Sequence, residues 1–221
     1  MLNNIASLHF LTQDLPAYSH EEQAKVACES GVKWVQLRMK DKPESEMLRI
    51  ANRVRAITNA FNALLIINDY PAVAKAVEAD GVHLGQEDMN WKEARNMLGS
   101  NFIIGLSVHS FPEIQEAKNA DVNYFGLGPF RFTQTKDKLD PVLGLKGINE
   151  IISQAHKQGI VKPMIAIGGI QPVDVNELLK AGVHGVAVSS AINQSQDPAK
   201  VIHELLSQLS FLNTKHKIFS I

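Results

Sequence analysis

The feature that most constrains the fold of this chain is a regular alternation of short β-rich runs with amphipathic segments. Eight such pairs follow one another with no linker or low-complexity stretch between them. Strands that alternate with helices are typical of parallel sheets, because a helix carries the chain back to the start of the next strand. The predicted strands are Leu8–Thr12, Lys33–Arg38, Leu64–Asn68, Gly81–Leu84, Ile103–Val108, Asn123–Leu127, Pro163–Ile167 and His184–Ser189.

The amphipathic segments predict helices, and several of these end at a glycine, for example Gly31, Gly159 and Gly182. The predicted helices are His20–Ser30, Ser45–Asn59, Ala72–Glu78, Trp91–Leu98, Pro112–Lys118, Leu145–Gln158, Pro172–Ala181 and Pro198–Leu209. Eight strand and helix pairs can close into a (β/α)8 TIM barrel, whereas an open doubly wound sheet usually has fewer strands and a dinucleotide-binding glycine motif. We therefore predict an α/β fold with a single barrel domain, residues 1–209, and a C-terminal tail, residues 210–221, of unknown role.

Composition argues against several classes of partner. The chain has 22 Lys and Arg against 23 Asp and Glu, a net charge of −1, which does not favour binding to nucleic acid or an anionic membrane. No apolar run approaches a membrane span, and the N-terminus shows no signal-peptide pattern. The single cysteine, Cys28, cannot form an intrachain disulfide. We expect a cytoplasmic protein that acts on small molecules and leave an oligomer possible.

The second predicted strand ends in a group of polar side chains. Reactive groups of TIM barrels collect at the C-terminal ends of the strands. Gln36, Arg38 and Lys40 share the face that points into the barrel, because side chains alternate along a strand. Arginine binds phosphate oxygens through two donors and lysine acts as a point charge, so this end suits a phosphorylated ligand. The alternative is a basic strand end that pairs with acids across the mouth of the barrel.

Carboxylates follow the next two predicted strands. Asp69 comes directly after the third strand, and Asp88 lies in the turn after the fourth. Such oxygen ligands predict Mg²⁺ held by one or two carboxylates and completed by substrate phosphate and water. The alternative for Asp88 is that it caps the following helix. His83 and His109 also lie near strand ends, but they belong to no zinc-ligand pattern.

Phosphate-binding signals follow the last strands. Gly168-Gly169 and Ser189-Ser190 each precede a helix, where backbone N–H groups, hydroxyls and the helix N-terminus favour an anion. A tight turn and a serine N-cap are the alternative. After the sixth strand, Thr133, Thr135 and Lys136 supply donors and a positive charge with no apolar run to bury them. This loop suits an anionic ligand, or else it is an ordinary solvated loop.

Up to about Leu209, the chain resembles the thiamine phosphate synthase family in the order and spacing of VQLRMK, IINDY, ADGVHLGQED, IIGLSVH, GLGPFRFTQTK, IAIGGI and GVAVSSAI. Members join 4-amino-2-methyl-5-hydroxymethylpyrimidine diphosphate to a thiazole phosphate and release pyrophosphate. The resemblance implies catalysis by Arg38, Lys40 and Lys136, and Mg²⁺ at Asp69 and Asp88. For the pyrimidine diphosphate it implies Gln36, Arg38, Lys40, Asn68, Ser107 and Lys136. For the thiazole phosphate it implies Thr133, Gln134, Thr135, Gly169, Ser189 and Ser190.

Two positions depart from the family pattern, and two other functions stay open. Tyr70-Pro71 follows Asn-Asp where many members have arginine, and Gln134 stands where proline is common. One alternative function is a thiazole tautomerase-like isomerase, which needs no groups for a departing diphosphate. The presence of Lys136, Asp69 and Asp88 together argues against it. The other is a non-catalytic barrel that binds phosphorylated ligands.

Overall fold

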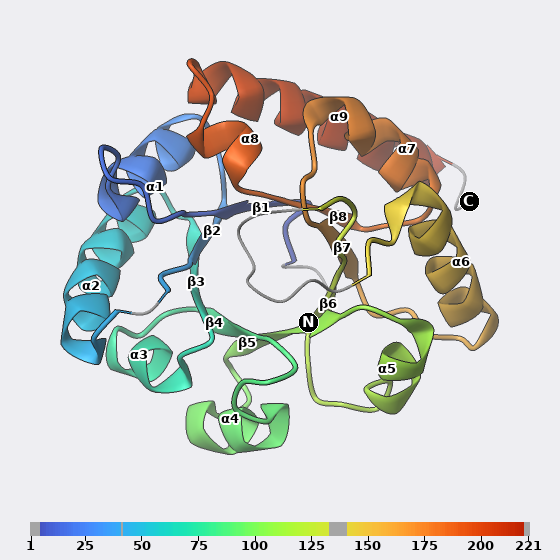
Figure 1. Ribbon diagram of the computed structural model, residues 1–221, viewed down its shortest axis with the longest axis horizontal. Helices are drawn as coiled ribbons and strands as arrows, with labels where there is room; N and C mark the ends of the chain where they lie inside the picture. The colour runs from blue at the N-terminus through green and yellow to red at the C-terminus, as the bar shows by residue number, and fades with distance from the viewer. Residues whose placement is uncertain (1–4, 41, 133–140, 219–221) are drawn as a thin grey trace.

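The computed structural model describes residues 5–40, 42–132 and 141–218, and only the backbone of residues 211–218. Eight parallel strands close into a barrel in sequence order, surrounded by helices (Figure 1), which confirms the predicted fold. Each predicted strand lies within one residue of the observed bounds. These are β1 Leu8–Leu11, β2 Trp34–Leu37, β3 Leu64–Asn68, β4 Gly81–Leu84, β5 Ile103–Val108, β6 Tyr124–Leu127, β7 Met164–Ile167 and β8 Gly185–Val188.

The helices agree with the prediction except near the C-terminus. They are α1 His20–Glu29, α2 Glu44–Ala60, α3 Pro71–Ala76, α4 Trp91–Leu98, α5 Phe111–Glu116, α6 Gly144–Lys157, the 3₁₀ helix η2 Pro172–Asp174, α7 Val175–Lys180, α8 Ser190–Asn193 and α9 Pro198–Ile218. The four-residue α8 was not predicted, because one turn is too short to show a helical period. The prediction that the last helix ends at Leu209 was wrong, since no glycine or proline stops α9 before Ile218.

Two apolar layers hold the barrel together. Outward-facing strand residues such as Val35 and Leu65 pack against the helices. Inward-facing Trp34, Ile66 and Tyr124 fill the interior, and each is almost completely buried. Burying a large apolar side chain stabilises the fold by roughly 1.5–3 kcal/mol. The interior is therefore a packed core, and the polar strand ends stand above it.

Glycines close the helix-to-strand turns at the N-terminal end of the barrel. Gly31, Gly159 and Gly182 have φ of 95°, 70° and 97°, a left-handed conformation that other residues rarely adopt. This agrees with the prediction that they end helices. Among the described residues, no helix is long and apolar enough to cross a membrane.

Candidate active site

A cavity of about 530 Å³ opens at the C-terminal ends of the strands, a size typical of small-molecule sites. Of the predicted site residues, Thr133, Gln134, Thr135 and Lys136 lie outside the described residues. All the others line this one cavity: Gln36, Arg38, Lys40, Asn68, Asp69, Asp88, Ser107, Gly169, Ser189 and Ser190. The barrel therefore brings together residues from six strand ends that are far apart in the sequence.

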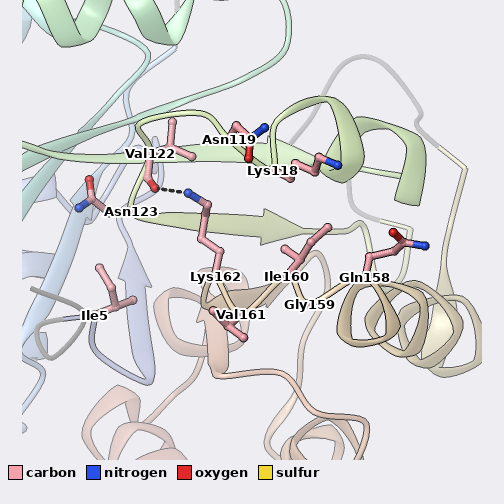
Figure 2. A pocket seen from close by; sticks show the side chains of 10 residues that line it. All are labelled: Ile5, Lys118, Asn119, Val122, Asn123, Gln158, Gly159, Ile160, Val161 and Lys162. Atoms are coloured by element: carbon pink, nitrogen blue, oxygen red, sulfur yellow. Dashed lines mark hydrogen bonds between the residues drawn. The ribbon is translucent and has the colours of Figure 1, made fainter.

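A second cavity lies at the opposite end of the barrel, beside the start of β6 and β7 (Figure 2). Lys162 lies in it and donates hydrogen bonds to the backbone carbonyls of Ala120, at 3.0 Å, and Val122, at 2.7 Å. Partial burial lowers the pKa of this lysine. Because its ammonium holds the turn that follows α5, and because reactive groups of such barrels lie at the other end, we interpret this cavity as structural.

A buried histidine organises the basic end of β2. The hydroxyl of Thr12 accepts a hydrogen bond from the backbone N–H of Arg38 at 3.1 Å, and Asp14 accepts one from the N–H of Lys40 at 3.1 Å. His20 joins these two acceptors through Nδ1, 2.8 Å from Thr12 Oγ1, and Nε2, 3.3 Å from Asp14 Oδ1. The network fixes the backbone from which both cationic side chains extend into the cavity. The sequence analysis missed it, although a histidine at the start of α1 was visible.

The two predicted metal ligands lie beside each other. Asp69 has a left-handed φ of 67°, and its N–H donates to the carbonyl of His83 at 2.9 Å. Burial raises the pKa of Asp69, a hydrogen bond with Asp88 and its charge raise it further, and Arg38 only partly opposes this. Two carboxylates this close need a shared proton or a cation between them. The donor set thus fits a divalent metal ion.

Asp88 does not cap α4, so that alternative was wrong. Asn90 is the N-cap, and its side chain accepts a hydrogen bond from the N–H of Lys92 at 2.9 Å. Asp88 instead accepts one from the N–H of Gly85 at 2.6 Å. A side chain at Gly85 would place a Cβ only 2.7 Å from the same carboxylate oxygen. The turn after β4 is therefore shaped to hold Asp88 at the cavity.

The glycine pair after β7 packs against the start of the loop after β6. Gly168 and Gly169 have φ of 98° and 65°, and a Cβ on Gly168 would lie 2.7 Å from Pro129 Cβ. Phe130 N–H donates to Ile167 O at 2.8 Å. The left-handed φ values and the close approach to Pro129 require glycine, and the turn brings its backbone to the rim of the cavity, as a phosphate site needs.

Ser189 precedes α8, but its side chain makes no capping hydrogen bond. Its hydroxyl lies 3.3 Å from the side-chain nitrogen of Asn193, which also donates to Leu11 O at 2.9 Å. Ser189 thus occupies the N-cap position of α8, as the alternative held, but its hydroxyl does not cap the helix. Its hydroxyl stands at the rim, where it can contact an anion.

Arg131 ties the loop after β6 to the turn after β7, a contact that the sequence analysis missed. Its guanidinium donates to both carboxylate oxygens of Asp174 and to Gly169 O at 3.1 Å. Asp174 also accepts the N–H of Gln171 at 2.8 Å. Burial raises the pKa of Asp174, but the hydrogen bonds from Arg131 and Gln171 outweigh it and hold the pKa below its ordinary value. The ion pair therefore stabilises the predicted phosphate turn.

Replacing Arg131 with methionine is expected to destabilise the fold by about 1–2 kcal/mol at neutral pH, because Arg131 is partly exposed and solvent screens the pair. The folded pKa of Asp174 lies below its unfolded value. The contribution of the Arg131–Asp174 ion pair to the free energy of unfolding is therefore full above about pH 4, and it is lost as the pH falls through the folded pKa of Asp174. Thermal unfolding should show a difference of roughly 2–8 °C at pH 7 that narrows in acid.

The matched control for Arg131→Met is Lys180→Met. Lys180 pairs with Glu177 at 2.6 Å on the exposed surface of α7, and such pairs contribute little to stability. We expect no measurable change in melting temperature. An Arg131→Met protein as stable as the wild type at both pH values would show that the ion pair does not hold the turn.

The closed barrel, with a basic strand end, an acidic pair and a glycine turn around one cavity, defines the class of barrels that handle phosphorylated small molecules. The model of the thiamine monophosphate synthase family matches residues 8–192, and the chain belongs to this family. It is 43% identical to the thiamine-phosphate synthase of Bacteroides fragilis over 201 residues, which cover 91% of this chain and 98% of the relative. The synthase of Flavobacterium psychrophilum is 41% identical over 202 residues, with the same coverage.

A solved structure agrees with this family. The thiamine phosphate pyrophosphorylase of Pyrococcus furiosus superposes with a TM-score of 0.82 at 35% sequence identity. The superposition covers 93% of this chain and 96% of that structure. The resemblance stated from the sequence is thus confirmed at the level of the family and of the fold.

Proposed function

We propose that this chain condenses 4-amino-2-methyl-5-hydroxymethylpyrimidine diphosphate with a thiazole phosphate to give thiamine phosphate and pyrophosphate. Membership of the family supports the reaction. The single observation that carries the assignment is that the described residues expected to bind both substrates line one cavity, from the ends of β2, β3, β4, β5, β7 and β8. The predicted cytoplasmic location and the oligomeric state stay predictions.

The chemistry needs charge neutralisation and alignment more than a general base. Breaking the bond between the pyrimidine methylene and its diphosphate leaves a cation that the electron-rich aminopyrimidine ring stabilises. The thiazole nitrogen then captures this cation. Arg38 and Lys40 neutralise the departing pyrophosphate, with Lys136 in the same role by resemblance.

The acidic pair supports a bound Mg²⁺. Asp69 and Asp88 would hold it, since their adjacent carboxylates favour a cation and a phosphate could complete its oxygen ligands. When bound, Mg²⁺ would add positive charge next to the leaving group. The described part of the chain has no cluster of three or more His, Cys, Asp or Glu suited to a metal. Substrate and water would therefore supply the remaining ligands.

The thiazole phosphate is proposed to bind at the rim formed by Gly169, Ser189 and Ser190. The glycine turn offers backbone N–H groups and the serines offer hydroxyls. This rim belongs to β7 and β8, whereas the basic and acidic groups belong to β2, β3 and β4. The two phosphorylated substrates thus enter one cavity from different strand ends, which places their reacting atoms between them.

An assay with both substrates and Mg²⁺ tests this function. The purified chain should release pyrophosphate and form thiamine phosphate in equal amounts, and should release nothing when either substrate is left out. Conversion of the thiazole alone would identify an isomerase. Tight binding of both compounds without pyrophosphate release would identify a non-catalytic barrel.

A further inference from the structure

Three polar side chains form a line of hydrogen bonds that leads from the cavity into the barrel interior. His83 Nδ1 lies 2.9 Å from the hydroxyl of Tyr124, and His83 Nε2 lies 3.0 Å from Ser107 Oγ. They come from β6, β4 and β5, in that order along the line. His83 and Ser107 line the cavity, whereas Tyr124 is almost completely buried below it. Tyr124 can therefore act on a ligand only through other residues.

Neighbouring strands make room for the two rings. A Cβ on Gly105 would lie 2.2 Å from the ring of Tyr124, and a Cβ on Gly126 would lie 2.9 Å from His83 Cε1. The indole of Trp34 packs edge-on against Tyr124, with the ring centroids 5.5 Å apart. The line of hydrogen bonds is therefore held rigidly by the barrel interior.

Gln36 also forms a side-chain hydrogen bond to Tyr124, so the phenol has two polar partners, Gln36 and His83. Because the phenol has one hydrogen, it donates either to His83 Nδ1 or to the amide oxygen of Gln36. An aminopyrimidine ligand needs an acceptor at Gln36 and a donor at Ser107, and this favours the direction in which the amide N–H of Gln36 donates to the phenol oxygen and the phenol donates to His83 Nδ1. A neutral imidazole that accepts at Nδ1 carries its hydrogen on Nε2. That hydrogen is donated to Ser107 Oγ.

We propose that Tyr124 is a positioning residue that sets the hydrogen-bonding pattern of the pyrimidine subsite through Gln36 and His83. With the amide nitrogen of Gln36 bound to Tyr124, its carbonyl oxygen is left to accept from the ligand. With Ser107 Oγ accepting from His83, its hydroxyl hydrogen is left to donate. An aminopyrimidine offers the matching amino donor and ring-nitrogen acceptor. The analogue with oxygen in place of the amino group offers the reverse pattern and is rejected.

This inference rests on the proposed function, because it needs Gln36 and Ser107 to hold the pyrimidine. Tyr124→Phe keeps the ring and removes the hydroxyl. We expect kcat/KM for the aminopyrimidine diphosphate to fall about 5- to 10-fold, as for one lost hydrogen bond, with the KM for thiazole phosphate unchanged. The preference for the amino compound over its oxo analogue should fall as well. Tyr18→Phe is the matched control and should leave all of these constants unchanged.

A double variant separates positioning from a merely structural role. The loss in Tyr124→Phe with Ser107→Ala should be smaller than the product of the two single losses, because both changes act on the same hydrogen bond to the substrate. Losses that multiply, or an unchanged preference between the two pyrimidines, would overturn the proposal.

Nitrogen-15 NMR of the wild-type chain tests the direction without any variant. The ring of His83 should carry its hydrogen on Nε2. A hydrogen on Nδ1 instead would overturn the proposal even if Tyr124→Phe failed to fold. A wild-type chain that forms no thiamine phosphate would reject the proposed function, and the NMR result would still report the direction of the line.

Discussion

Replacing Asp69 or Asp88 with asparagine is expected to raise the Mg²⁺ concentration needed for half-maximal activity by roughly 10- to 100-fold or more. Mutating even a residue that only hydrogen-bonds to a metal ligand typically lowers metal affinity by about this factor. Each change removes one negative charge from the pair of carboxylates that we propose as ligands. Turnover should fall too, because less of the charge on the departing pyrophosphate is neutralised. Activity measured over a range of Mg²⁺ concentrations checks both expectations.

The stability of the same variants distinguishes a metal site from a structural one. Burial and Asp88 disfavour the ionised form of Asp69. The neutral side chain of Asp69→Asn should therefore not lower the melting temperature in the absence of Mg²⁺. Asp121→Asn is the matched control, because that side chain is exposed beside Arg95 and away from the cavity. It should leave the Mg²⁺ requirement unchanged. Full activity of both variants at low Mg²⁺ would reject these ligands.

The sequence was sufficient to predict the barrel because the two-residue period of strands and the helical period of about 3.6 residues alternate along the whole chain. Strand residues such as Val35 and Leu65 are buried against helices, and Gly31 or Gly182 ends a helix where a turn must begin. Once the barrel is assumed, every strand end lies on one rim. For this reason Arg38, from β2, could be placed beside a carboxylate from β3 without any coordinates.

Contacts between residues far apart in the sequence could not be predicted in the same way. Arg131 and Asp174 are 43 residues apart, and His83 and Tyr124 are 41 apart. No periodic pattern relates them, since their contact depends on how strands and turns pack. Local chemistry was ambiguous as well. Asp88 and Asn90 are both good helix N-caps, and only the structure shows that Asn90 caps α4 and leaves Asp88 for the cavity.

The loop that carries Lys136 begins and ends at the cavity rim. The N–H of Leu143 donates to Pro129 O at 2.9 Å, and the N–H of Gly144 donates to Phe130 O at 3.1 Å. Pro129 itself lines the cavity. These bonds hold together the two described ends of the loop, while Lys136 lies outside the described residues. Its proposed role therefore rests on the family resemblance and on the position of the loop ends.

Lys136→Ala is expected to lower kcat by about 10²- to 10³-fold, by analogy with loss of a donor that stabilises charge in a transition state. The charge on the leaving oxygen grows as the carbon–oxygen bond breaks, so an ammonium at the pyrophosphate contributes most in the transition state. The KM for thiazole phosphate should change little. Steady-state kinetics with each substrate varied in turn measures both effects.

Two further variants make the Lys136 result specific. Lys146→Ala removes an ammonium that is exposed on α6 beside Glu150, and it should leave kcat unchanged. Thr135→Val should raise the KM for thiazole phosphate more than it lowers kcat, because a hydroxyl that binds this substrate contributes mainly to its KM. If Lys136→Ala kept its kcat and raised only the thiazole KM, the loop would belong to the thiazole phosphate. Arg38 and Lys40 would then be the protein cations left to neutralise the departing pyrophosphate.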